Sequence, residues 1–442
     1  MVAAKPFSGV RSWGVSPRVF AVAAGWVAVV IGGSSLGHAQ TTYTWLGGGA
    51  NDGWNTGFNW DTFSVPPTSS PAVTSIIDST LPGVVTSVAE NPPDIRDGGR
   101  LNLQLSGGTL NINNSTWRYG YENNGSTSNL IRVGGGTVAA NLNRNSNGSS
   151  GNMFGGASFL MGVRGSAEQA IRVLANGAVK VRVASASPSP FNDTVVGPTF
   201  PNNQAANARI SLEAGRWDNG SKILALGYDQ NTQKGFFDFT GGELANVSSY
   251  LGMSRIPTDY PASSVNWNLV DYSTQTTLLQ QGGTIKPGTV TYPGNNYVNA
   301  VEDPIGVMTI YGNLTQQALG AIAIDIAGTS TSQYDRLQVL PATAVLGGGT
   351  AGGGVVSLAG LLQINPINGF TAQPGDTFNV LTAATSIDVT GLTISDPGYT
   401  FQVVGGNTLQ VQAVPEPSTL GIAGAAALAL GVLGRRARRR AA

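Results

Sequence analysis

Apolar and polar residues alternate with a period of two in many short runs along the chain, and turn residues interrupt these runs. In six places a glycine pair, an Asn-Gly or, once, an Ala-Gly separates two of the runs. Alternation predicts a β-strand with one buried face, and glycine between two runs predicts a tight turn. Each unit is therefore expected to form a strand, a turn and a second strand. The six units are residues 105–110, 133–138, 174–179, 212–217, 239–244 and 279–285.

The turn glycines of the six units recur at irregular intervals. The intervals are 28, 42, 38, 26 and 41 residues, roughly one or two coils of a β-solenoid with insertions. A coil needs glycine where the chain bends with positive φ, and it needs alternation that sends every second side chain into the lumen. We predict an all-β fold, a right-handed parallel β-helix or solenoid with capping segments, with antiparallel β-sandwich domains as the alternative. The glycines are Gly107, Gly135, Gly177, Gly215, Gly241 and Gly282.

Changes in composition divide the chain into six segments. A leader is followed by a Trp/Gly/Asn-rich N-terminal cap, a Pro-rich irregular segment, the irregular solenoid repeats, a β-rich region of closing rungs and a C-terminal sorting segment. In that order, the segments are residues 1–39, 40–64, 65–98, 99–300, 301–413 and 414–442.

The composition favours short strands over long helices. Glycine accounts for 61 of the 442 residues and charged residues for 11%, while a hydrophobic share of 41% suffices for a core. The chain has no Cys, so its stability must come from packing without disulfides. Residues 40–414 carry 16 basic and 23 acidic side chains, a net charge of −7. This mildly acidic balance argues against nucleic acid as a partner.

The first 39 residues have the organisation of a cleaved signal peptide. A basic region precedes the apolar run 19–33, and Gly37, His38 and Ala39 place small residues where signal peptidase cleaves. Fifteen helical residues reach about 22 Å, short of a hydrocarbon core of about 30 Å, which disfavours a retained anchor. We expect export through the Sec machinery and cleavage by signal peptidase after Ala39.

Three elements follow one another at the C-terminal end. Pro415, Glu416 and Pro417 precede the apolar run 420–434, and a cluster of arginines follows it. The prolines keep the chain extended where a protease would bind it. The apolar run predicts a short transmembrane segment, and the arginines are expected to stop it on the cytoplasmic side. The predicted membrane-stop residues are Arg435, Arg436, Arg438, Arg439 and Arg440.

This C-terminal arrangement resembles the PEP-CTERM sorting signal over about the last 28 residues. The resemblance implies an exosortase-like membrane protease as a partner, which cleaves near the Pro-Glu-Pro motif. It also implies transient anchoring in the inner membrane, followed by delivery to the cell surface or the exopolysaccharide matrix of a Gram-negative bacterium.

Two further stretches resemble exported bacterial repeat proteins. Residues 43–61, YTWLGGGANDGWNTGFNWD, look like the start of proteins with autotransporter-associated β-strand repeats. Residues 300–412 look like the closing rungs of autotransporter-type passenger domains, with the segments 334–337 (YDRL) and 374–378 (PGDTF) as the similar pieces. Both resemblances imply a β-helical ectodomain.

Three tryptophans lie among the Gly and Asn residues of the N-terminal cap. Trp45, Trp54 and Trp60 could stack on sugar rings, which would make extracellular polysaccharide a ligand. Alternatively, they plug the open end of a solenoid, where an apolar face would otherwise meet water. The plug is the favoured interpretation.

Histidine and cysteine, two side chains common in catalytic and metal sites, are missing from the predicted mature chain. The one histidine is His38 in the leader, so the mature chain has neither His nor Cys. This excludes Ser-His-Asp and Cys-His triads and metal sites with His or Cys ligands. Paired acids could still serve a glycosidase or hold Ca²⁺ for a lyase, but acids this scattered are expected at turns and solvated surfaces. The pairs weighed are Asp94 with Asp97, Glu302 with Asp303, and Asp238 with Glu243.

We therefore expect an exported structural or adhesive protein of the cell surface or extracellular matrix, with no catalytic residues, metal or cofactor. The alternatives are a polysaccharide-active enzyme, a glycosidase or lyase on a β-helix, and a carbohydrate-binding module.

Overall fold

The computed structural model describes most residues between 41 and 415, and β-strands dominate this part of the chain. Among these residues no helix is long and apolar enough to cross a bilayer, and the predicted transmembrane segment 420–434 lies outside them. The described ranges are 41–44, 46, 57, 60–65, 73–77, 85–88, 101–107, 109–114, 116–119, 129–144, 158–161, 168–185, 194–196, 207–226, 234–251, 277–293, 297–341 and 353–415.

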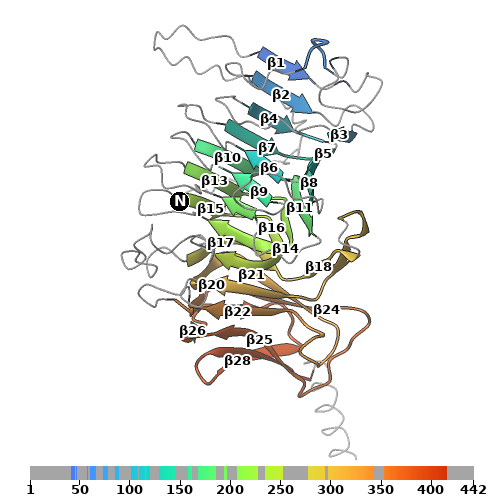
Figure 1. The fold of residues 1–442 in the computed structure, drawn as a ribbon. Coiled ribbons are helices and arrows are strands. Elements are labelled where there is room, and N and C mark those ends of the chain that lie inside the picture. Colours follow the sequence, from blue (N-terminus) through green and yellow to red (C-terminus); the bar gives the residue numbers. More distant parts are fainter. Residues whose placement is uncertain are drawn as a thin grey trace, which may run out of the picture. The chain divides into compact units, whose positions relative to one another are not determined.

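The strands form three parallel ladders, which we call A, B and C, and most coils in the described part of the chain contribute a strand or half-strand to each (Figure 1). Ladder A contains β1 (Thr41–Thr44), β2 (Val73–Ile77), β4 (Leu101–Leu105), β7 (Asn129–Val133), β10 (Glu168–Val173), β13 (Asn207–Leu212), β15 (Lys234–Phe239), the first parts of β17 (Thr277–Lys286) and β21 (Asn313–Ile326), β23 (Val355–Leu358) and β26 (Ser386–Asp388).

Ladders B and C follow A within each coil. Ladder B contains β3 (Val85–Val88), β5 (Thr109–Asn114), β8 (Thr137–Arg144), β11 (Ala178–Ser185), the first parts of β14 (Arg216–Leu226) and β16 (Glu243–Leu251), the second parts of β17 and β21, β24 (Leu361–Pro366) and β27 (Thr393–Ile394). Ladder C contains β6 (Thr116–Tyr119), β9 (Ser158–Met161), β12 (Thr194–Val196), the second parts of β14 and β16, β20 (Val307–Tyr311), β22 (Arg336–Leu340) and β25 (Thr377–Ala383).

Three parallel ladders fed in turn by one chain make a β-solenoid, so the predicted fold class is confirmed and the antiparallel sandwich is wrong. The ladders also cross residue 300 without a break, because β17 pairs with β21 and β16 with β20. The segment 65–98 was expected to be irregular, yet it contains β2 and β3. Its prolines misled the prediction because they flank these two strands and leave the strand interiors proline-free.

Glycines occupy the corner between ladders A and B in successive coils. A Cβ atom on Gly177 would lie 2.0 Å from the carbonyl oxygen of Val133, and one on Gly215 would lie 2.2 Å from that of Gly177. Gly215 also has a φ of 71°, which side-chain-bearing residues rarely adopt. Each interval between the turn glycines is therefore a single coil, and insertions outside the ladders account for the unequal lengths.

The core is built from inward side chains that stack in register from coil to coil. In ladder A, one buried column runs through five successive rungs, and in ladder B a second column includes the fully buried Trp217. Such columns bury apolar surface continuously, so each coil depends on its neighbours for a complete core. The ladder A column is Leu105, Val133, Val173, Leu212 and Phe239.

Two antiparallel elements depart from the coil. Residues 287–305, which we call the arm, contain β18 (Thr289–Thr291), the 3-10 turn η4 (Tyr297–Asn299) and β19 (Val301–Asp303), with β18 and β19 paired. Near the C-terminal end, β29 (Thr408–Ala413) lies between β25 and β28 (Tyr399–Val404), antiparallel to both. This reversal ends the parallel ladder and caps the solenoid.

Candidate functional site

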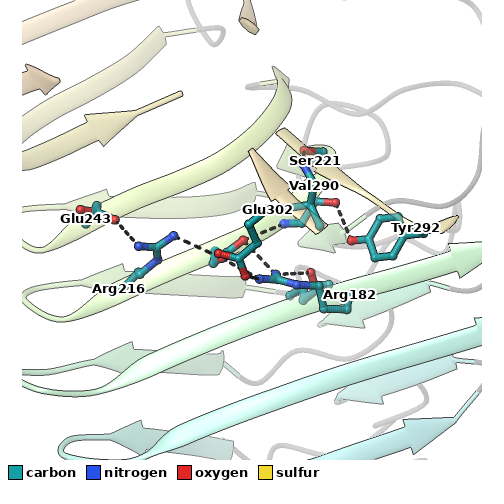
Figure 2. A network of polar contacts seen from close by, with 10 residues as sticks. Arg182, Arg216, Ser221, Glu243, Val290, Tyr292 and Glu302 are labelled. Atoms are coloured by element: carbon teal, nitrogen blue, oxygen red, sulfur yellow. Dashed lines mark hydrogen bonds and ion pairs between the residues drawn. The ribbon is translucent and has the colours of Figure 1, made fainter. Parts of the chain in front are cut away.

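The largest cluster of charged side chains in the described part of the chain lies on ladder B, beneath the arm (Figure 2). Arg182 on β11 donates two hydrogen bonds to Asp218 on β14, at 2.9 Å to Oδ1 and 2.8 Å to Oδ2. Arg216 lies 3.4 Å from the same carboxylate and 2.8 Å from Glu243 on β16. The parallel register places β11, β14 and β16 in adjacent coils, so the charges form a chain across three rungs.

The arm docks onto this cluster through polar contacts. Glu302 of β19 accepts a hydrogen bond of 2.5 Å from Arg182, and the hydroxyl of Tyr292 donates to the carbonyl of Gly220 at 2.7 Å. The backbone N–H of Val290 donates to the Ser221 hydroxyl at 2.5 Å. The arm leaves the coil after β17 and lies against β16, β14, β11 and β8, so it connects four earlier rungs.

Local backbone geometry makes this docking site. Strand β14 bulges at residues 219–221, where Gly220 and Ser221 both have positive φ, and the register with β16 shifts at this point. The bulge turns the Gly220 carbonyl and the Ser221 hydroxyl toward the arm. A Cβ on Gly220 would lie 2.5 Å from the Tyr292 hydroxyl oxygen, so only glycine lets the arm approach this closely.

The electrostatics of the cluster hold its groups ionised. Burial alone would raise the pKa of Asp218, but the hydrogen bonds and charge of Arg182, together with Asn246 and the Gly220 N–H, lower it below its ordinary value. Burial would lower the pKa of Arg182, and Asp218 outweighs it, so the pKa of Arg182 is raised. An acid with a lowered pKa and a base with a raised pKa stay charged near neutral pH, so they are poor proton donors or acceptors. The arrangement is therefore suited to holding the arm in place.

A second polar cluster lies where the chain passes from ladder B to ladder C, in the coil after the arm. Asp335 is fully buried and accepts N–H bonds from Gly306 at 2.7 Å and from Asp325 at 3.0 Å. Asp325 accepts a bond of 3.0 Å from Asn365 Nδ2 and lies 3.5 Å from Lys286 Nζ. Burial raises the pKa of Asp335 to about 8, against the opposing effect of its two N–H donors.

The acid pairs weighed from the sequence do not converge on a groove. Glu302 binds Arg182, and Asp303 accepts the N–H of Ile305. Asp238 pairs with Arg209, and Glu243 pairs with Arg216. Residues 94 and 97 lie outside the described residues. Each of these four acids therefore has a structural partner.

The tryptophans of the N-terminal cap are only partly described. The Trp60 ring is fully buried and belongs to the core cluster, with the neighbouring Asp61 N–H bonded to the Thr44 carbonyl of the first rung. A buried indole cannot stack on a sugar ring, so Trp60 is corrected from a sugar contact to a core residue. Trp45 and Trp54 lie outside the described residues.

The predicted processing residues lie at the ends of the described chain. Pro415 is exposed and follows the cap strand β29 by a single residue, Val414, whose N–H bonds the Gly398 carbonyl. Ala39, Glu416, Pro417 and the five arginines of the tail lie outside the described residues. In the part of the chain that the structure describes, no group of three or more acids or histidines converges as a metal site.

The two polar clusters were missed by the sequence analysis. Arg182 and Asp218 are 36 residues apart, and Arg182 and Glu302 are 120 apart, so no local motif joins them. The sequence offered one signal for these contacts, the intervals between the turn glycines. If each interval is taken as one coil, the intervals determine which residues of successive coils lie next to one another.

Comparison with known proteins adds one assignment. No curated protein matches the chain. Residues 413–440 match the PEP-CTERM protein-sorting motif, so the chain carries at its C-terminal end the signal of an exported protein that an exosortase sorts.

Proposed function

We propose that the protein is a structural or adhesive component of the cell surface or extracellular matrix of a Gram-negative bacterium. The observation that carries the proposal is the junction between the solenoid and the sorting motif. The cap strand β29 ends at Ala413, and the matched motif begins at residue 413. The end of the solenoid therefore coincides with the start of the sorting motif, which supports a role for the solenoid as the delivered cargo.

The organisation of the solenoid supports a structural role. Its described charged side chains form ion pairs between adjacent coils, and an ion pair from Glu302 to Arg182 joins the arm to an earlier rung. Buried and paired charges of this kind hold a conformation and leave little capacity for acid or base catalysis. A stack of rungs stabilised by nearest-neighbour packing also presents long outer faces for contacts with a polymer.

The proposed route begins with signal peptidase cleavage after Ala39 and export. The apolar run 420–434 then halts in the inner membrane, and the arginines remain cytoplasmic. An exosortase-like protease cuts near Pro415, Glu416 and Pro417 and releases the solenoid. Because β29 precedes these residues, the cut leaves the cap intact.

Replacement of Pro415, Glu416 and Pro417 by Ala tests this route. Export should continue, and uncut protein should collect in the inner-membrane fraction, because moving five arginines across the membrane costs about 2.5 to 3.5 kcal/mol each on insertion scales. The matched control replaces Pro374, a proline in the folded domain, by Ala and should be sorted normally. Surface delivery of the triple variant at wild-type size would contradict the proposal.

We also propose that the protein is not an enzyme, and we retain a polysaccharide-active enzyme and a carbohydrate-binding module as the alternatives. The purified mature chain should show no turnover on a panel of polysaccharides. Turnover that disappears on substitution of one carboxylate would establish the enzyme, whereas saturable binding without turnover would establish the binding module.

A further inference from the structure

The cluster at the passage from ladder B to ladder C brings a lysine amine against a buried carboxyl group. Lys286 ends β17, and Asp325 lies on β21 in the next coil, with Nζ 3.5 Å from Oδ2. The Asp325 side chain is 4% exposed and that of Lys286 is 32% exposed. The parallel pairing of Ile285 with Ile322 places Lys286 opposite Ala323, so Asp325 is its diagonal neighbour, two residues further along β21.

Asn365 contacts the Asp325 carboxyl, and Asp335 lies beside the Asp325 backbone. Asn365 Nδ2 donates to Oδ1 at 3.0 Å, where it would stabilise negative charge developing on that oxygen. Asp335 Oδ2 accepts the backbone N–H of Asp325 at 3.0 Å. Since burial raises the pKa of Asp335 to about 8, this carboxyl carries a proton near neutral pH and is available as an acid.

These four groups are those that amide formation requires: an amine nucleophile, a carboxyl electrophile, a donor to the carboxyl oxygen and a proton-transferring acid. We propose that Lys286 and Asp325 condense to an amide that covalently links adjacent coils of the solenoid. The inference concerns the folded ectodomain and does not depend on the proposed surface role.

The reaction balances without any co-reactant. A proton passes from the Lys286 ammonium to the Asp325 carboxylate within the ion pair, and the Nζ lone pair then attacks Cγ. The new N–C bond gives a tetrahedral centre whose oxygen accepts the Asn365 N–H. Asp335 protonates the departing hydroxyl and recovers a proton from nitrogen, the C–O bond breaks, and one water molecule leaves.

Proximity lowers the activation barrier that lysine and aspartate face when they are dilute in water. Fixing two groups in reactive geometry is equivalent to effective concentrations of about 10⁵ to 10⁸ M. Forming the amide also removes two opposite charges from a mostly buried site, which saves their desolvation cost. In a chain without Cys, such a link would take the place of a disulfide next to the point where the arm interrupts the coil.

Intact-mass spectrometry of the purified protein tests the proposal. The wild-type chain, after incubation at neutral pH, should be lighter than its calculated mass by one water molecule. A proteolytic map should yield one branched peptide that contains both Lys286 and Asp325. Its mass and fragmentation are the readout, because trypsin does not cleave the Lys286–Pro287 bond in either state. A wild-type chain at full mass, with a linear Lys286 peptide, would overturn the proposal.

Matched variants separate this link from other dehydrations. Lys286→Arg keeps the ion pair but removes the reactive amine, so it should show the full calculated mass while retaining the β-rich circular dichroism of the wild type. Asp335→Asn, in a sample shown by circular dichroism to be folded, should form the link at least tenfold more slowly. Loss of water from Lys286→Arg would assign the change to a succinimide and overturn the proposal.

Discussion

Arg182 and Asp218 form a doubly hydrogen-bonded ion pair between adjacent coils, with both side chains buried in the wall of the solenoid beneath the arm. Glu302 binds the same guanidinium from the arm, but its side chain is 49% exposed. The two acids therefore hold one cation in different surroundings, and their removal should have unequal consequences.

Asp218→Asn should destabilise the protein strongly, by up to about 3–5 kcal/mol, since the buried Arg182 charge then keeps only the half-exposed Glu302 as its acidic partner. Glu302→Gln should cost less than about 1 kcal/mol, because water screens an exposed pair. Urea unfolding measures both. Hydrogen exchange at Val290 and Tyr292 should accelerate in Glu302→Gln while the core stays protected. Equal losses of stability in the two variants would contradict this account.

The corner glycines can be tested with a matched pair of substitutions. Gly215 and Gly369 have φ values of 71° and 74°, but a Cβ would meet the Gly177 carbonyl at 2.2 Å in the first case and open space in the second. Gly369→Ala should cost about 1–2 kcal/mol for the left-handed backbone alone. Gly215→Ala should cost several kcal/mol more, because the coil spacing must open. Equal unfolding temperatures for the two variants would contradict the idea that the coil spacing at this corner requires glycine.

Asp335 predicts a loss of stability as the pH rises. Its pKa is 3.8 in the unfolded reference and about 8 in the folded protein, so its favourable contribution is present below pH 3.8 and disappears as the pH approaches 8. Each unit of pKa difference corresponds to about 1.4 kcal/mol. Urea unfolding between pH 5 and 9 should show the decline, and Asp335→Asn should flatten it. Asp388→Asn, at an exposed turn, is the control and should leave the slope unchanged over this range.

Asp218 predicts the opposite dependence at low pH. Its pKa is lowered in the folded protein, so its contribution is present above the unfolded value and is lost as the pH falls below it. The fully buried pair should therefore limit acid stability. The protection factors of the arm amides, which are exchange rates corrected for the intrinsic effect of pH, should fall on acidification to pH 3. Protection factors that stayed constant after Asp218 titrated would refute the linkage.

The C-terminal cap can be tested by two truncations. A chain that ends at Val414 retains β29 and should unfold at the wild-type temperature. A chain that ends at Asn407 lacks β29, so the edges of β25 and β28 lose their partner and should promote association. Light scattering and thermal unfolding compare the two. A monomeric and equally stable shorter chain would show that β29 is no cap.

The corners of the coil were predictable because they depend on local chemistry. Gly135 and Gly215 have positive φ in the structure, as the turns between alternating runs required. The burial of Leu105 and Val133 likewise follows from alternation, which places every second side chain inside. The segment 65–98 was assigned as irregular because strands of four or five residues between prolines carry little periodic signal.

The sequence by itself determined that the chain is β-rich, that it turns at the six glycine units, and that it ends in a sorting motif, because each of these is encoded by neighbouring residues. Only the tertiary structure decided that each interval is one coil, that Glu302 reaches Arg182, and that Lys286 faces Asp325. These relationships depend on which rungs stack, and insertions of variable length between the rungs hide the register until the backbone hydrogen bonds of the parallel ladders set it.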